Sequence, residues 1–89
     1  MQNNDVQRYL ENWGGERNSA AIYQALSESE KDERIAEVYR RMAEIEIRHA
    51  RKWEAHIRDA GGQVPVFQPA LRTRILIRLA RRFGPALVL

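Results

Sequence analysis

Apolar residues recur along most of this chain at steps of three and four, which is the spacing of an amphipathic α-helix. The first run extends over about 5–29, and the polar residues at 3–5 are good helix-capping residues at its start. Gly14 and Gly15 interrupt this run, so the helix either restarts there or leaves room for another backbone. The apolar positions of this first predicted helix are Val6, Tyr9, Leu10, Trp13, Ala20, Tyr23 and Leu26.

A second helix is predicted over 32–60, after a short polar joint at 29–32. Asp32 can cap its start, and Gly61 followed by Gly62 is a strong signal for its end. A short joint between two long helices indicates an antiparallel hairpin. The inner face expected for this second helix consists of Ile35, Val38, Tyr39, Met42, Ile45, Glu46, His49, Trp53 and Ile57.

A third, shorter helix is expected from Pro69, in its first turn, to about Phe83, where Gly84 and Pro85 end it. One of its faces is apolar and the remainder carries arginines. Such a helix can lie on an anionic membrane or bind a partner helix, but its apolar face favours packing over the hairpin. The apolar face is Leu71, Ile75, Leu76, Leu79, Ala80 and Phe83, and the arginines are Arg72, Arg74, Arg78, Arg81 and Arg82.

Composition limits what the chain can be. Its 89 residues make one domain at most, and so short a chain buries a limited core unless a metal or a partner chain adds to it. Without Cys, disulfides and thiolate metal sites are excluded. The net charge of +3 comes from the five arginines after Gly61, where there is no acid, so the part before Gly61 carries 3 − 5 = −2. The basic balance therefore predicts no nucleic-acid partner, and no motif for one is present.

Three residues of the hairpin are candidates for metal binding. Glu46 and His49 stand three apart and share one helix face, while Glu16 lies on the apolar stripe three residues after Trp13. Glu16 and Glu46 are each about 15 residues from the joint, so an antiparallel hairpin brings them level. Carboxylates on an inner face repel each other and lose hydration unless a cation binds. The sequence therefore predicts a metal site at Glu16, Glu46 and His49, with His56 at its rim.

These residues also carry a resemblance. Glu16 with Tyr23 seven residues later, followed by Glu46-Ile-Arg-His49 thirty residues after Glu16, resembles the ferritin-like family in its rubrerythrin and encapsulated-ferritin branch. The likeness is greatest to the N-terminal ferritin-like domain of membrane-bound ferritins and of iron/manganese transporters of the vacuolar iron transporter type. It covers about 8–61, and the Pro-rich joint and the Arg-Arg-Phe-Gly-Pro segment also resemble that group.

The resemblance implies a carboxylate-bridged di-iron centre, a ferroxidase that oxidises Fe(II) with O2 or peroxide for iron storage or detoxification. In it, Glu46 would bridge the irons, Glu16 would be a terminal ligand and His49 the nitrogen ligand. Tyr23 matches the family's tyrosine beside these ligands and completes the expected catalytic set. Mn or Zn can occupy the same donor atoms.

The chain carries only half of such a site. A di-iron bundle takes one Glu from each of two helices and a Glu-x-x-His from each of two others, and this chain has one of each. Either two chains pair into a four-helix bundle, as a homodimer or a larger oligomer of dimers, or the chain is a fragment; both can hold. We therefore expect an all-α fold with a hairpin at 1–61, half of a di-iron bundle, and a linker with a basic helix at 62–89.

Two other functions stay open on the sequence alone. One is a non-catalytic iron- or manganese-binding regulatory domain of a membrane metal transporter, with the transporter domain or the membrane surface at its C-terminal side. The other is a structural hairpin without metal. The expected location is the cytoplasm, at the cytoplasmic face of a membrane or inside an encapsulin compartment.

Overall fold

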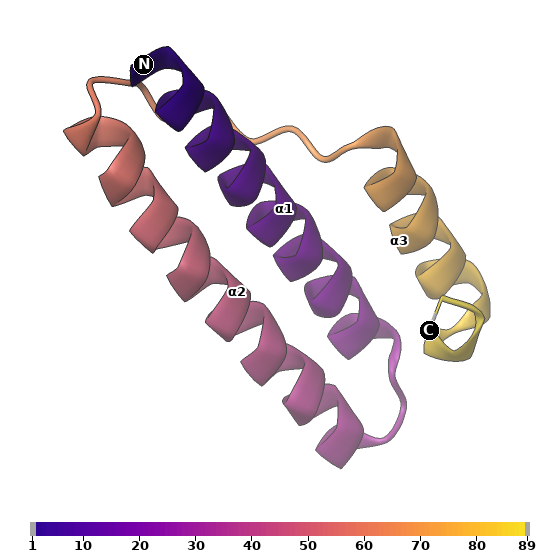
Figure 1. Ribbon diagram of the computed structural model, residues 1–89. Coiled ribbons are helices and arrows are strands. Elements are labelled where there is room, and N and C mark those ends of the chain that lie inside the picture. The colour runs from indigo at the N-terminus through magenta and orange to yellow at the C-terminus, as the bar shows by residue number, and fades with distance from the viewer. Residues whose placement is uncertain (1, 89) are drawn as a thin grey trace.

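The computed structural model describes residues 2–88, with side chains from Asp5 onward, and its helices form an elongated molecule (Figure 1). The first two helices run antiparallel as a hairpin, and the third lies on the far side of the first. The expected all-α hairpin with a short third helix is therefore confirmed. In chain order the elements are α1 (Gln2–Ser29), α2 (Glu33–Asp59), α3 (Leu71–Phe83) and the 3-10 helix η1 (Pro85–Leu87).

The ends of α2 are formed by the residues that the sequence indicated. The Asp32 side chain accepts a hydrogen bond from the backbone N–H of Arg34 at 2.9 Å, which satisfies one of the free donors of the first turn. At the other end Gly61 takes a φ of 84°, and the N–H of Gly62 donates to the carbonyl of Ile57 at 2.8 Å. This left-handed glycine cap satisfies the last carbonyls and turns the chain out of the helix.

Gly14 and Gly15 do not interrupt α1, so the expectation that the helix restarts there was wrong. Nothing in the described chain lies within 4 Å of a Cβ built on either glycine, so no backbone of the same chain approaches them. The hydrogen bonds of a long helix therefore carry it through two residues of low helix propensity.

Residues seven positions apart, most of them small, form the contact between α1 and α2. A seven-residue spacing keeps side chains on one slowly twisting seam, and alanine on such a seam lets two helices approach closely. On α1 the seam buries Trp13, Ala20 and Ser27, and on α2 it buries Ala36, Ala43, Ala50 and Ile57.

The expected inner face of α2 was wrong at four of its large aliphatic positions, whereas Ile57 is buried as expected. Ile35, Val38, Met42 and Ile45 are 37–53% exposed rather than packed against α1. The alanine seam lies next to this apolar stripe on the helix, and the close approach of the helices selects the smaller side chains. The hairpin thus buries its alanines and leaves a second apolar stripe without a partner among the described residues.

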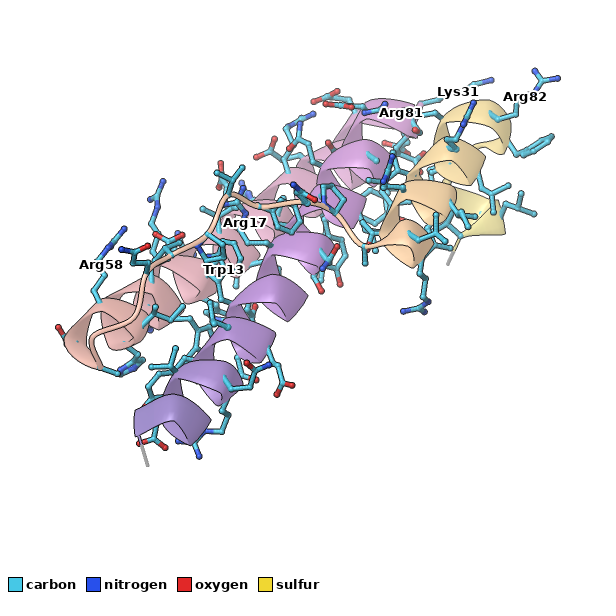
Figure 2. All side chains as sticks on the ribbon, turned by 90° about the horizontal axis from the view of Figure 1, so that it is seen from above. Trp13, Arg17, Lys31, Arg58, Arg81 and Arg82 are labelled. Carbon is cyan, nitrogen blue, oxygen red and sulfur yellow. The ribbon has the colours of Figure 1, made fainter. Side chains whose placement is uncertain are left out.

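The linker between α2 and α3 packs on the hairpin instead of forming a free connection. Val64 and Phe67 contact the core cluster formed by Trp13, Ala50 and Ile57. The Phe67 ring meets the Trp13 ring edge-on at 6.0 Å, and the Arg17 guanidinium lies 4.6 Å from the Phe67 ring centre. In Figure 2 the linker crosses over the hairpin beside the labelled Trp13 and Arg17. These contacts fix where α3 begins.

α3 runs alongside the C-terminal half of α1 and in the same direction. The backbone N–H of Ala70 donates to Asn18 Oδ1 at 2.9 Å, and Arg81 pairs with Glu28 at 3.5 Å near the other end. Pro69 lies before the helix rather than in its first turn, because Ala70 has the extended conformation of a cap. The expected end of α3 is confirmed, since Gly84 there takes a φ of 92°.

Candidate metal centre

Glu16, Glu46 and His49 meet at mid-height of the hairpin. Glu16 comes from α1, and the other two lie one turn apart on α2. Of the residues that the structure describes, only these three form a group whose possible metal-binding atoms all lie within 4.8 Å of one another. The helical phases and the short joint together predicted this convergence, and the structure confirms it.

The distances suit a shared cation. His49 Nδ1 lies 3.3 Å from Glu16 Oε2 and 3.6 Å from Glu46 Oε1. Oxygen and nitrogen ligands bind a transition metal at about 2.1 Å, which puts neighbouring ligand atoms about 3 Å apart. The three donor atoms therefore need only small side-chain shifts to surround one ion.

The two carboxyl groups disturb each other. The neighbouring carboxyl group of Glu16 raises the pKa of Glu46 above its ordinary value, and partial burial raises it further. His49 acts in the opposite direction on the pKa of Glu46 but is outweighed. The carboxyl pair thus favours a bound proton, and a metal cation can replace that proton.

The site is open to the outside of the hairpin. The side chain of His49 is 48% exposed, and those of Glu16 and Glu46 are 26% and 23% exposed. Two shallow hollows of about 250 and 400 Å³ adjoin the group, with Trp53 lining both. The first is lined by Glu16, His49, Lys52, Trp53 and His56, and the second by Glu11, Asn12, Gly15, Glu16, Ser19, Glu46 and Trp53.

The structure separates Tyr23 and His56 from the three donor atoms. Tyr23 lies two helical turns along α1 from Glu16, and its ring stacks on that of Tyr39 with centres 6.4 Å apart. His56 stacks on Tyr9 at 5.4 Å and lines the smaller hollow, which agrees with its expected place at the rim. Catalytic participation of Tyr23 stays a prediction.

Two polar residues of the hairpin, one of them at the site, were not identified from the sequence. Lys52 follows His49 by one helical turn, so the spacing could have placed it beside the hollow. Glu54 gave no such signal, yet it accepts a hydrogen bond from Trp13 Nε1 at 3.0 Å and so links the two helices. A contact between residues 41 positions apart depends on the packing of the hairpin.

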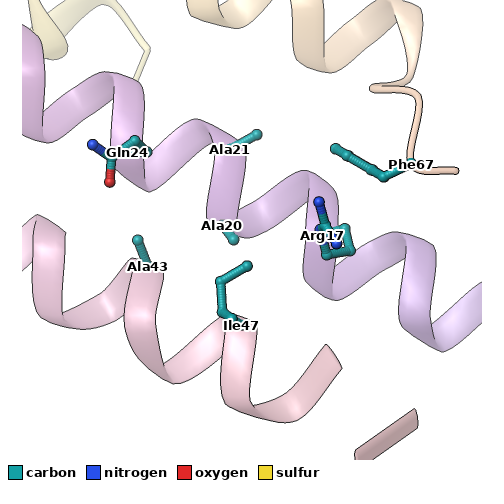
Figure 3. Close-up of a pocket in the computed structure, with 7 residues that line it drawn as sticks. All are labelled: Arg17, Ala20, Ala21, Gln24, Ala43, Ile47 and Phe67. Atoms are coloured by element: carbon teal, nitrogen blue, oxygen red, sulfur yellow. The ribbon is translucent and has the colours of Figure 1, made fainter. Parts of the chain in front are cut away.

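The opposite side of the α1–α2 seam is chemically different. Arg17 and Ile47 directly follow Glu16 and Glu46, so each lies about 100° further around its helix. Figure 3 shows the hollow there, of about 210 Å³, with Ala20, Ala43 and Ile47 between the helices and Phe67 and Arg17 at one end. It has no carboxylate in its lining, so the candidate metal ligands are confined to one side of the hairpin.

No known protein family, curated protein or solved structure matches the chain. The resemblance to the ferritin-like family therefore stays an expectation from the sequence. No helix within residues 2–88 has both the length and the apolar character to cross a bilayer.

Proposed function

We propose that two copies of this chain pair through the side of the hairpin that bears Glu16, Glu46 and His49, and that the pair is a di-iron ferroxidase. The observation that carries the proposal is the place of the three donor atoms. They converge within 4.8 Å at the surface, next to an apolar stripe that has no partner in the part of the chain that the structure describes. A second copy on this face covers the stripe and doubles the ligand set.

The large exposed area of the chain supports pairing with a second chain. The chain exposes 6480 Å², whereas a compact monomer of 10.4 kDa exposes about 5400 Å². The excess of about 1100 Å² is close to the roughly 800 Å² that each partner contributes to a typical interface. The apolar stripe lies at the helical phase of the site, since Met42, Glu46 and His49 follow each other at steps of four and three.

The chemistry of the carboxylate and imidazole ligands supports iron as the bound metal. Two carboxylates and one imidazole per chain are too few for two metals, and twofold symmetry raises them to four carboxylates and two imidazoles, the set used by di-iron bundles. Carboxylate and imidazole donors without thiolate suit Fe(II) and Mn(II), and Zn(II) binds the same atoms. In this arrangement Glu46 and Glu16 of each chain would hold the two metals through carboxylate oxygens, Glu46 as the shared ligand and Glu16 as the terminal one, and His49 would provide nitrogen.

Iron is the substrate of the proposed reaction. Two Fe(II) ions give up one electron each, and O2 takes up both electrons with two protons to form hydrogen peroxide. The protein holds the two ions side by side and offers oxygen ligands that stabilise the higher charge of Fe(III).

The test is an anaerobic Fe(II) titration of the chain and of Glu46→Ala, followed by mixing with air in a stopped-flow instrument. We expect two Fe(II) per dimer, at least tenfold weaker binding in the variant, and oxidation that is much faster than in buffer. Glu44→Ala is the matched control, because Glu44 is an exposed carboxylate of the same helix outside the group. Sedimentation velocity at the same concentrations reports whether metal tightens the dimer.

Each outcome has a consequence for the proposal. Equal Fe(II) binding by Glu46→Ala and the original chain contradicts the assigned ligands. A monomer at all concentrations that binds two metals per chain contradicts the shared site. Tight Fe(II) binding without accelerated oxidation favours the non-catalytic regulatory domain of a metal transporter.

A further inference from the structure

The outward side of α3 is the most basic part of the molecule. From Gly61 onward the chain has five arginines and no acidic residue. Arg81 pairs with Glu28 of α1, whereas in the described part of the chain no carboxylate lies within 4.0 Å of the other four guanidinium groups. Figure 2 shows Arg82 pointing away from the hairpin at the end of α3. Those four positive charges are therefore free for an external partner.

The packing of α3 on α1 decides which side chains face outward. Thr73 and Ala80 are buried, so they mark the side of the helix that packs on the rest of the chain. On the opposite side of α3, exposed residues follow one another at steps of four, three and four positions. We name it the basic face; it consists of Leu71, Ile75, Arg78 and Arg82 with Arg74 at its edge.

Apolar side chains stand among the arginines of the basic face. Leu71 is 71% exposed and Ile75 is 50% exposed. Together with Arg74 and Arg78 they line a shallow surface hollow of about 390 Å³. Phe83 at the end of α3 and Leu87 in η1 are also more than half exposed. The face thus combines a row of cations with large aliphatic side chains that water does not favour.

We propose that the basic face docks onto a bilayer that contains anionic phospholipids. A guanidinium binds lipid phosphates through two parallel hydrogen bonds, and the aliphatic side chains enter the boundary between headgroups and acyl chains. α3 then lies in the plane of the membrane surface with α1 and α2 above it. A nucleic acid also attracts arginines, but it offers nothing to Leu71 and Ile75, so the apolar side chains favour lipid.

The proposal does not depend on the metal centre. The basic face belongs to α3, and α1 lies between α3 and α2, which carries Glu46 and His49. Binding can therefore be measured in the presence of a chelator, so that failure of the metal proposal leaves this test unaffected.

The experiment is co-flotation with extruded vesicles, either of phosphatidylcholine alone or with a third of phosphatidylglycerol, at low and high salt. We expect binding to the anionic vesicles only, and weaker binding at high salt. Each arginine near an anionic surface contributes about a fivefold gain in affinity, so Arg78→Glu, which changes the charge by two, is expected to weaken binding about 25-fold. Ile75→Asp is expected to weaken it at least as much.

Arg51→Glu is the matched control, because Arg51 is an exposed arginine of α2 that makes the same change in net charge. It is expected to change affinity less than twofold if the basic face is the contact. Circular dichroism checks that every variant keeps its helices. An equal loss with Arg51→Glu, unchanged binding by Ile75→Asp, or no binding to anionic vesicles would overturn the proposal. Tighter binding to single-stranded RNA than to vesicles in the same buffer would overturn it in favour of a nucleic acid.

Discussion

Neutralising Glu46 should stabilise the metal-free protein, because it removes one of two like charges that lie close together in the folded state. The change is Glu46→Gln, which keeps the shape of the side chain and its ability to hydrogen-bond Glu16 and His49. The atoms of the group lie within 4.8 Å of one another. Two like charges at that separation repel by about 1 kcal/mol in water and by about 3.5 kcal/mol at an effective dielectric constant of 20. Because both carboxylates are about one quarter exposed, we expect a gain of about 1–3 kcal/mol.

The gain should depend on pH with a defined sign. The pKa of Glu46 is raised in the folded state, so the unfolded chain releases this proton first as the pH rises. Folding stability is therefore lost between the ordinary value of 4.5 and the raised pKa, and Glu46→Gln avoids that loss. The advantage of the variant should therefore be larger at pH 8 than at pH 4, where it should fade toward zero.

The assay is urea unfolding followed by circular dichroism, in chelator and at one protein concentration, at both pH values. Glu44→Gln is the control for net charge, since Glu44 lies on the same helix outside the group. A double-mutant cycle is completed by the variant Glu16→Gln and by the double variant with Glu46→Gln. In this cycle the second neutralisation should add little to the unfolding free energy gained by the first. Additive gains, an equal gain from Glu44→Gln, or the same gain at pH 4 would refute the proposed repulsion.

Two further predictions concern the hairpin itself. Ala50→Leu should cost about 1–3 kcal/mol of unfolding free energy, because Ala50 is 1% exposed in the seam between α1 and α2. In the same urea assay the control Ala55→Leu, at an exposed position of α2, should change the unfolding free energy by less than about 0.5 kcal/mol. Gly15→Ala should raise the stability of the single chain by up to about 1 kcal/mol, because a Cβ built at Gly15 has nothing within 4 Å. A melting temperature below that of the original chain at high protein concentration would show instead that a partner chain packs on this glycine.

The secondary structure could be predicted because its signals are local. Asp32 accepts from an N–H two residues away, and the Gly61–Gly62 pair closes the last turn of the helix before it. Such contacts need no information about the rest of the chain. The same holds for the spacing of Glu46 and His49, since a helix brings residues three apart onto one face whatever it packs against.

The convergence of Glu16 with that pair needed one more step, which the sequence also allowed. A short polar joint makes the hairpin antiparallel, and equal distances from the joint bring residues level. The structure confirms that the three donor atoms meet. Whether they hold a metal is a question of chemistry that the metal titration answers.

The choice of seam depended on the tertiary structure. α2 offers two adjacent stripes, one of alanines and one of large aliphatic residues, and hydrophobicity alone favours the larger ones. Close approach of two helices favours the smaller ones, because more backbone and Cβ atoms then come into contact. Ala36, Ala43 and Ala50 are therefore buried, while Ile35 and Ile45 stay exposed.

The sequence by itself therefore determined the three helices, both ends of α2 and the phase of each side chain, since these depend on neighbours within about four residues. Only the tertiary structure decided which stripe closes the hairpin, that Phe67 of the linker packs on Trp13, and that α3 turns Leu71 and Ile75 outward. These features arise from the fit between surfaces distant in the sequence. Each helix has more than one apolar stripe, so its sequence leaves several such fits possible.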